Sequence, residues 1–323
     1  MLKTLRECPP PAGVGLPLRA IFHPMGYAVE ISSNSPDVLG AAAKLWSRYP
    51  VLSDAEPIRI RVMFGAAQAS SLRQPLPPRI EGRLFLIVHG VQDFAVADLS
   101  TGLAFVSLSQ DSISEHSYFS YHFLEPLAYV MQGARHFVFV HASCISRNGR
   151  AILLCGDSGS GKTCLAYACA KRGWEFVSGD AVQIVRGRND RMIIGRPYEV
   201  RFRESARDLF PELNFRHAGI RANGKLDLEL DTGELGIPVA LQSFACHIVF
   251  IERSNVNRIE TCARASAMRK LEETICYGDD RTQLEQRETL SHFSGLPIWR
   301  LCYSDLDRAE RTLASLLDGE LSC

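Results

Sequence analysis

The sequence has no excess of either charge and no apolar run long enough to cross a membrane. Its 36 lysine and arginine residues balance 36 aspartate and glutamate residues, so no overall field attracts nucleic acid or an anionic lipid surface. No apolar stretch approaches the roughly 20 residues that a membrane-spanning helix needs. Residues 1–15 carry charges and prolines without an apolar centre, which does not fit a signal peptide. We therefore expect a soluble, cytoplasmic protein that has neither a nucleic acid nor a membrane as its partner.

Paired cysteines of the Cys-x-x-Cys kind are also missing. Ten cysteines are scattered along the chain, and several stand in apolar runs, among them Cys144, Cys155 and Cys169. Cysteine in such a run usually acts as a small hydrophobic residue. Disulfide frameworks are typical of much shorter secreted chains, so the pattern predicts reduced thiols.

The length of 323 residues predicts two domains. Within residues 1–125, apolar and polar residues alternate in several short stretches, of which Ile58–Phe64 is the clearest, and one helix signal starts at Pro36. This first domain is predicted to be strand-rich and α+β, and none of its residues forms a chemical motif. An apolar, aromatic segment over 118–131 predicts a buried helix at the junction, and residues 126–323 form the second domain.

The second domain begins with a predicted hairpin. Residues Phe137–Ile145 predict one strand, Asn148-Gly149 is a strong turn signal, and Arg150–Cys155 predicts the returning strand. Apolar segments over 174–177 and 247–251 predict further strands, the latter of the fully buried kind. Helix-compatible segments between these strands give an α/β class for this domain and α+β for the whole chain.

A glycine-rich motif of the form G-x-x-x-x-G-K-[ST] follows the predicted strand directly. Its residues are Gly156, Asp157, Ser158, Gly159, Ser160, Gly161, Lys162 and Thr163. Glycines let backbone N–H groups turn toward phosphate oxygens, and the start of the following helix adds partial positive charge. The motif predicts a nucleoside triphosphate site in which Lys162 contacts the terminal phosphates and Thr163 holds Mg²⁺. The other interpretation, an ordinary glycine-rich turn, leaves Lys162 unexplained.

Phosphoryl transfer also needs a carboxylate near the metal, at the end of a strand beside the loop. Asp180 is the best candidate because it follows the apolar strand over 174–177. Its alternative role is that of a loop aspartate that caps a turn. Glu252 ends another apolar strand and is the second candidate, or else a solvated strand end beside Arg253.

Two further groups are candidates for the chemistry. His141 precedes the hairpin and is either a hydrogen-bonded core residue or part of the site. Alternation over 198–204 places Arg201 and Arg203 on one face of a strand, next to Glu204. The two arginines either bind phosphates or form a salt-bridged edge.

Together the glycine-rich motif, His141 and the strand-end Asp180 resemble the C-terminal kinase domain of the HPr kinase/phosphorylase family. The resemblance begins at His141, continues through Gly156–Thr163, and takes in Lys171-Arg172-Gly173 and the strand that ends at Asp180. It covers about residues 135–185. It implies a P-loop kinase domain of the HPr kinase and phosphoenolpyruvate carboxykinase type, with ATP and Mg²⁺ as cofactors and a hydroxyl, usually of a serine in a protein, as the acceptor. It also implies that the chain forms a homo-oligomer, because the family often forms rings.

By this resemblance Lys162 binds phosphate, Thr163 and Asp180 hold Mg²⁺, and His141 supports the acidic centre. The family has an Asp-Asp pair whose first member is the base, and this sequence has Gly179 in that place. Glycine cannot accept a proton, so either Asp180 covers both roles, a carboxylate such as Glu204 substitutes, or transfer is inefficient.

Three functional hypotheses follow. The first is an ATP- and Mg²⁺-dependent kinase that phosphorylates a hydroxyl group, of a serine in a protein or peptide or of a small molecule. The second is a nucleotide-binding regulatory module or pseudokinase, which Gly179 favours. The third is a generic P-loop ATPase. The sequence has no clear second strand that ends in an acidic pair near the loop, which is mild evidence against this hypothesis.

Overall fold

The computed structural model describes residues 15–65, 76–109, 116–220, 226–273 and 280–320. The chain divides into two compact units, Met1–Gln132 and Gly133–Cys323. The division falls inside helix α4 (Glu125–Arg135), which belongs to the apolar segment expected at the junction. Within the described residues, no helix combines the length and the apolar composition needed to cross a membrane.

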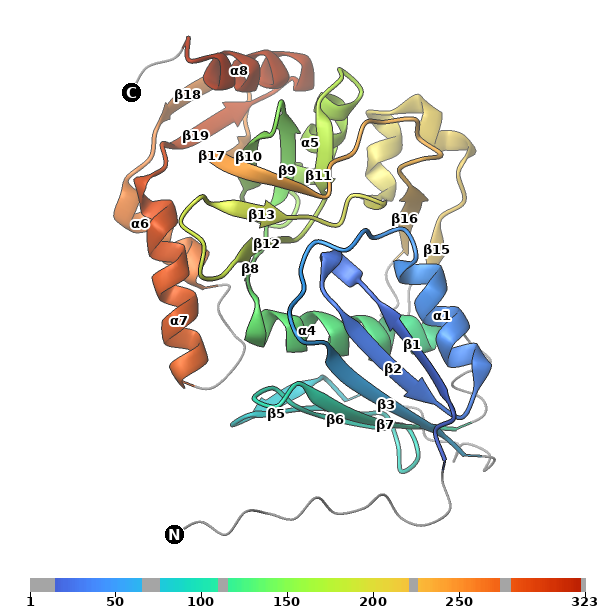
Figure 1. Cartoon of the computed structure of the whole chain (residues 1–323). Coiled ribbons are helices and arrows are strands. Elements are labelled where there is room, and N and C mark those ends of the chain that lie inside the picture. The colour runs from blue at the N-terminus through green and yellow to red at the C-terminus, as the bar shows by residue number, and fades with distance from the viewer. Residues whose placement is uncertain (1–14, 66–75, 110–115, 221–225, 274–279, 321–323) are drawn as a thin grey trace. The chain divides into compact units, whose positions relative to one another are not determined.

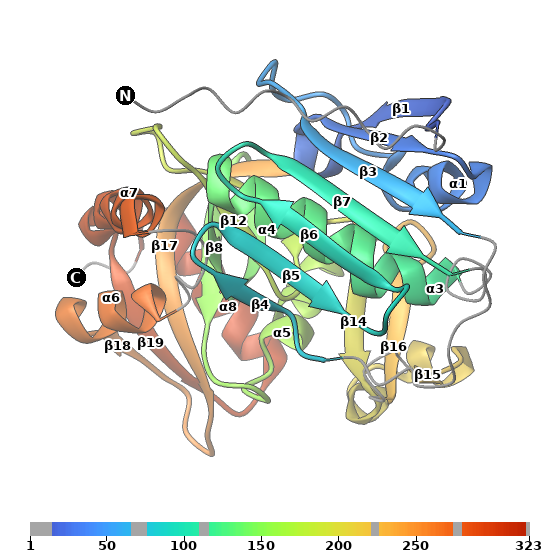
Figure 2. The same cartoon turned by 90° about the horizontal axis from the view of Figure 1, so that it is seen from below.

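The first unit contains a mixed sheet with the strand order β1-β2-β3-β7-β6-β5-β4. Figure 2 shows these strands side by side. They are β1 (Leu18–Phe22), β2 (Val29–Ser33), β3 (Ile58–Phe64), β4 (Arg79–Glu81), β5 (Leu84–Val88), β6 (Phe94–Asp98) and β7 (Leu103–Leu108). Strand β3 has the predicted bounds, and its apolar residues Ile58, Ile60 and Val62 are buried while the arginines between them are exposed.

The helices of the first unit follow the predicted signals in part. Helix α1 (Pro36–Trp46) begins at its proline, with Ser35 as N-cap. The segment expected as one buried helix instead contains α3 (His116–Phe119), a π-helical turn η2 (Ser120–Leu124) and then α4. A short 3₁₀ turn, η1 (Pro24–Gly26), precedes β2.

The second unit contains a large mixed sheet. Its strand order is β11-β9-β10-β17-β13-β12-β8, with β19 paired to β17 and β18 paired to β19. The strands are β8 (Phe137–Val140), β9 (Ser143–Arg147), β10 (Arg150–Cys155), β11 (Glu175–Ser178), β12 (Val182–Val185), β13 (Met192–Ile194), β17 (Gln242–Arg253), β18 (Arg258–Thr261) and β19 (Ile298–Tyr303). Strands β10, β17 and β19 are parallel to one another, so their carboxyl ends lie at one edge of the sheet.

The prediction of one strand over Phe137–Ile145 is wrong. The chain breaks at His141 and Ala142, and the two halves join different neighbours. Strand β8 pairs with β12, whereas β9 pairs with β10 and β11. The run contains no glycine or proline, so only the long-range pairing of its two halves fixes the break.

Helices cover both faces of this sheet (Figure 1). Helices α5 (Lys162–Ala170) and α8 (Leu306–Asp318) pack on one face, and α6 (Arg264–Glu272), α7 (Asp280–Ser291) and the 3₁₀ turn η5 (His292–Gly295) pack on the other. The apolar residues of β10, Ala151–Cys155, are buried between these two layers. The glycine-rich motif therefore starts from a rigid, fully covered strand.

A small sheet with the order β14-β16-β15 completes the second unit. It consists of β14 (Glu199–Arg203), β15 (Gly219–Ile220) and β16 (Leu226–Asp231), with the 3₁₀ turns η3 (Glu204–Asp208) and η4 (Pro211–Phe215) beside it. Tyr167 of α5 packs edge-on against Phe202 and Phe210, with ring centroids 5.1 and 4.9 Å apart. This aromatic cluster holds the end of β14 next to α5.

Candidate functional site

The glycine-rich loop, Gly156–Gly161, connects β10 to α5. Its three glycines have φ angles of 149° at Gly156, 90° at Gly159 and 92° at Gly161, a region that other residues rarely adopt. A Cβ on Gly156 would lie 2.7 Å from the Ile251 carbonyl oxygen, and one on Gly161 would overlap the Tyr303 hydroxyl. The loop is thus closed against its neighbours, and only glycine fits at both ends of it.

Helix α5 begins at the end of this loop without a capping side chain, because its N-cap residue is Gly161. The first intrahelical hydrogen bond of the helix runs from the Leu165 N–H to the Gly161 carbonyl. The N–H groups before Leu165 therefore have no acceptor within the helix. Together with the helix dipole, they favour an anion in front of the loop.

Lys162 is buried, and its ammonium group lies over the loop. Its Nζ donates to the Gly156 carbonyl at 2.8 Å and to the Asp157 carbonyl at 3.2 Å. Burial lowers the pKa of Lys162, while the Asp180 carboxylate opposes that shift. A bound anion would favour the charged form, so anion binding and protonation of this lysine support each other.

Thr163, Ser143 and Gly179 meet on the side of the loop toward β9 and β11. The Thr163 hydroxyl donates to the Gly179 carbonyl oxygen at 2.8 Å, and the Ser143 hydroxyl donates to the same oxygen. Because the Thr163 hydroxyl points its proton toward Gly179, the lone pairs of its oxygen point away from Gly179. Thr163 can therefore offer an oxygen ligand next to the first turn of α5.

Asp180 and His141 lie beside this group. The Asp180 side chain is 77% exposed, and its Oδ1 lies 3.3 Å from Nδ1 of His141. Asp180 comes after β11 and His141 stands in the break between β8 and β9. The structure therefore brings together four of the predicted residues, Lys162, Thr163, Asp180 and His141, at one end of the loop.

Two side chains from other strands donate hydrogen bonds to the loop. Arg203, the last residue of β14, donates from Nη2 to the Ser158 hydroxyl at 2.8 Å. Tyr303, the last residue of β19, donates to the Ser160 carbonyl at 2.9 Å. Burial raises the pKa of Tyr303, and the neighbouring Arg253 opposes that shift. The sequence analysis named Arg203 as a candidate but not Tyr303 or Arg253, which reach the loop only through the strand order.

Three other predicted residues, Glu204, Glu252 and Arg201, lie outside the group formed by Lys162, Thr163, Asp180 and His141. Glu204 is an exposed residue at the start of η3, and no hydrogen bond or ion pair within the described residues joins it to the loop. Glu252 lies at the carboxyl end of β17 and lines a pocket next to the loop. Arg201 pairs with Glu199 at 2.5 Å and with Glu229 at 3.1 Å, so it forms the salt-bridged edge that was the alternative to phosphate binding.

The loop also contains a polar atom that lacks a partner. Oγ of Ser160 is buried and forms no hydrogen bond within the part of the chain that the structure describes. Buried hydroxyls are almost always hydrogen-bonded, so an exception requires an explanation. A ligand oxygen or nitrogen in front of the loop would satisfy this hydroxyl.

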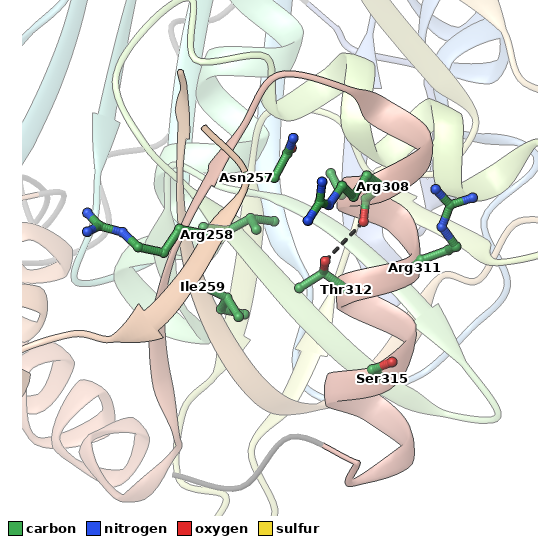
Figure 3. A pocket seen from close by; sticks show the side chains of 9 residues that line it. Asn257, Arg258, Ile259, Arg308, Arg311, Thr312 and Ser315 are labelled. Carbon is green, nitrogen blue, oxygen red and sulfur yellow. Dashed lines mark hydrogen bonds between the residues drawn. The ribbon is translucent and has the colours of Figure 1, made fainter. Parts of the chain in front are cut away.

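Two pockets lie near the carboxyl edge of the sheet and α8. One, of about 380 Å³, adjoins the loop and is lined by residues of β17, α6 and the loop itself. The other, of about 310 Å³, lies between β18 and α8 (Figure 3). Polar groups around this second pocket have partners in the protein: the Thr312 hydroxyl donates to the Arg308 carbonyl, and the Asn257 amide bonds Ser304.

The donor set near the loop suits a hard cation held partly by phosphate. Among the described residues, no cluster of three or more His, Cys, Asp or Glu side chains could hold a metal ion by itself. Thr163 and Asp180 offer a hydroxyl and a carboxylate, both oxygen ligands. Mg²⁺ is commonly bound by one or two protein oxygens together with substrate phosphates, so these two residues fit it.

The fold places a glycine-rich loop at the carboxyl ends of parallel strands, where open α/β sheets usually bind ligands. No protein-family model matches the chain, and no curated protein matches its sequence. Among solved structures, the chain is similar to the Hpr(Ser) kinase/phosphatase from Coxiella burnetii, with 11% identity and a TM-score of 0.29. The match covers 56% of this chain and 95% of that chain. A structural similarity this weak does not indicate a shared activity, so the activity has to be inferred from the site.

Proposed function

We propose that this chain binds a nucleoside triphosphate together with Mg²⁺ and transfers the terminal phosphate to a hydroxyl group. The acceptor is a serine of a protein or peptide, or a small molecule. One observation carries the proposal: a loop closed by left-handed glycines opens onto the uncapped start of α5, with the Lys162 ammonium directly over it. This arrangement supplies converging N–H groups and a cation to a polyphosphate.

The loop and Lys162 would stabilise charge on the phosphates. Loop N–H groups point toward oxygens of the bound chain, and Lys162 exchanges its carbonyl partners for the terminal phosphates. Arg203, which donates to the Ser158 hydroxyl, adds a second positive charge. Fixed donors of this kind act on the charge that develops during transfer and need no rearrangement at that moment.

Thr163 and Asp180 would hold the metal. Mg²⁺, when bound, neutralises negative charge on the transferring phosphoryl group. The hydrogen bond to Gly179 fixes the rotamer of Thr163, and His141 fixes the position of Asp180. In this way two short-range contacts orient both protein ligands.

The acceptor hydroxyl would be deprotonated at Asp180 and His141. The acceptor oxygen forms a bond to the terminal phosphorus, the bridging P–O bond breaks, and the nucleoside diphosphate leaves. The hydroxyl proton passes to the Asp180–His141 pair, because Gly179 offers no side chain for it. A base at these positions is typically worth 10²–10⁴-fold in rate.

A regulatory nucleotide-binding module is the second candidate. Gly179 favours this alternative, because its only polar group near Thr163 is a carbonyl that already accepts two hydrogen bonds. Such a module would bind the nucleotide and change its affinity for a partner without transferring phosphate.

The test uses nucleotide labelled at the terminal phosphate, Mg²⁺ and a lysate as the source of acceptors. Transfer to a discrete acceptor supports the kinase, and tight binding without transfer supports the regulatory module. Lys162→Ala should lower transfer by about 10²–10³-fold. Lys44→Ala changes an exposed lysine of the first unit and serves as the control. If Lys162→Ala leaves both nucleotide binding and transfer intact, neither candidate function holds.

A further inference from the structure

We infer that the pocket between the loop, β17 and α6 receives the base and ribose of the nucleotide, an inference that rests on the function proposed above. The pocket has a volume of about 380 Å³, which lies in the usual range for small-molecule sites. Its walls include Gly156, Asp157 and Ser160 of the loop. A ligand can therefore pass from the loop into the pocket without crossing other structure.

The position of the pocket follows from the strand order. Strands β10, β17 and β19 end at one edge, and the pocket lies in the crevice beyond their ends. In open α/β sheets this crevice is the usual place for a ligand. The metal side of the loop, with Thr163, Asp180 and His141, faces β9 and β11 instead. None of these three residues lines the pocket.

The two sides of the loop can therefore serve the two ends of one ligand. The terminal phosphate lies at Asp180 and His141, where the acceptor must reach it. The nucleoside at the other end of the polyphosphate needs a different wall, and the pocket next to the loop provides one. An acceptor held in this pocket would lie away from the proposed base.

The lining matches the chemistry of a nucleoside. Phe250 and Ala267, on the α6 face of the sheet, form the apolar part of the lining, against which a flat base can pack. The Lys270 ammonium lies 5.8 Å from the centroid of the Phe250 ring. Around the rim stand groups that can accept or donate hydrogen bonds to ribose hydroxyls and base edges: Glu252, Ser266, Lys270 and Arg300.

Ser160 connects the pocket with the loop. Its hydroxyl is the buried group that lacks a partner within the described residues, and Ser160 also lines the pocket. A ligand that spans loop and pocket passes this hydroxyl and can satisfy it. The unsatisfied group thus lies at the point where phosphate and nucleoside would join.

The first experiment separates the nucleoside from the phosphates. Calorimetry compares ATP and GTP with inorganic tripolyphosphate, each with Mg²⁺, on the full chain. Ser266→Trp places a large side chain in the pocket from an exposed position on α6, and Ala265→Trp places the same side chain on α6 at an exposed residue that does not line the pocket. We expect Ser266→Trp to weaken binding of the better nucleotide at least about tenfold. The affinity of Ser266→Trp for tripolyphosphate should stay within about twofold of that of the unaltered chain. Ala265→Trp should change neither the nucleotide affinity nor the tripolyphosphate affinity.

The second experiment needs no variant. The 8-azido derivatives of ATP and GTP are bound with Mg²⁺ and cross-linked by light, and the labelled peptide is identified. Label in β17 or α6 supports the inference, and label elsewhere in the chain overturns it. Ser266→Trp could weaken the binding of nucleotide and of tripolyphosphate equally because it damages the loop. In that case the position of the cross-link decides whether the inference holds.

The remaining outcomes are distinct. If Ser266→Trp changes neither nucleotide nor tripolyphosphate binding, the nucleoside lies outside the pocket and the inference fails, while the proposed function stands. If it raises the KM for the acceptor and leaves nucleotide binding alone, the pocket is the acceptor site and the inference also fails. If the unaltered chain binds none of the three probes, the proposed function fails first.

Discussion

Nδ1 of His141 lies 3.3 Å from Oδ1 of Asp180, although the two residues come from different strand ends. His141 occupies the break between β8 and β9, and Asp180 follows β11, which pairs with β9. The pairing brings both side chains to the same end of the loop. Because Asp180 is largely exposed, this contact with His141 limits the directions that its side chain can take.

His141→Ala is expected to lower phosphate transfer by about 10²-fold while nucleotide binding changes little. In the proposed function the imidazole supports the carboxylate that meets the acceptor, and no hydrogen bond joins the imidazole to the loop within the described residues. Initial rates and calorimetry on the same preparation measure the two effects separately. His292→Ala, at an exposed histidine of η5, is the control. Equal loss of binding and rate in His141→Ala would show that His141 supports the loop and not the transfer step.

Arg203 and Arg201 give a matched pair on one strand. Both lie on β14, but Arg203 donates to Ser158 of the loop, whereas Arg201 is held by Glu199 and Glu229. We expect Arg203→Ala to weaken nucleotide binding about tenfold, because the proposed charge-assisted contact of Arg203 with phosphate would be lost. Arg201→Ala should leave nucleotide affinity within about twofold, since its carboxylate partners are not part of the loop.

Calorimetric titration with Mg²⁺ and ATP measures both arginine variants. Thermal melting without nucleotide serves as the control for folding. A similar loss of affinity in the two variants would show that the effect belongs to the small sheet as a whole. In that case Arg203 would have no separate role at the phosphates.

The central part of the site could be predicted because it is contiguous in the sequence. The glycine spacing and the order strand, loop, helix are local patterns, and the structure has β10, the loop and α5 in that order. Asp180 could be placed near the loop because it ends an apolar strand. Neither Tyr303 nor Arg253 could be placed, because they reach the loop only through the pairing of β17 and β19 with β10.

Helices α6 and α7 and the break at His141 have weaker signals in the sequence. Helices α6 and α7 are mostly polar, and only a narrow stripe on each is buried, such as Ala267, Met268 and Leu271 on α6. A stripe of this width is hard to distinguish from a polar loop. The break at His141 lies in an apolar run without turn residues, so its position depends on which strands the two halves join.

Stability is expected to fall in mild acid because of two partly buried histidines, His136 and His122. Burial lowers the pKa of His136 to about 4, and the positive charges of Arg135 and Arg186 add to the shift. Burial likewise lowers the pKa of His122 in the first unit to about 4. The unfolded chain protonates these groups near their ordinary pKa of 6.5, so it binds more protons than the folded chain between pH 6.5 and 4. Stability is therefore fully present above about pH 6.5 and is lost as the pH falls through this range.

Thermal melting at pH 7.5, 6 and 5 measures this effect. We expect the melting temperature to fall by several degrees toward pH 5, and His136→Gln to remove part of that slope. His292→Gln changes an exposed histidine and should leave the slope as it is. A melting temperature that does not change between pH 7.5 and 5 would contradict the burial argument.

Gly179→Asp tests whether a missing carboxylate limits transfer. A Cβ at position 179 would lie 3.3 Å from Phe176 Cζ and 3.3 Å from Thr163 Cγ2, so any side chain there requires small shifts. Gly179→Ala introduces the same Cβ without the carboxylate and is the matched control. Both variants should lose about 1 kcal/mol of stability from overpacking, which thermal melting can compare directly.

The rates of the two variants then isolate the carboxylate. If Gly179→Asp transfers phosphate at least about tenfold faster than Gly179→Ala, a carboxylate at this position can act as the base and its absence limits the rate. If the two rates are equal, Asp180 and His141 already suffice, or the chain is a regulatory module. Transfer by the unaltered chain separates these two cases. A regulatory module binds nucleotide and transfers nothing, whereas an Asp180–His141 base supports measurable turnover that His141→Ala lowers about 10²-fold.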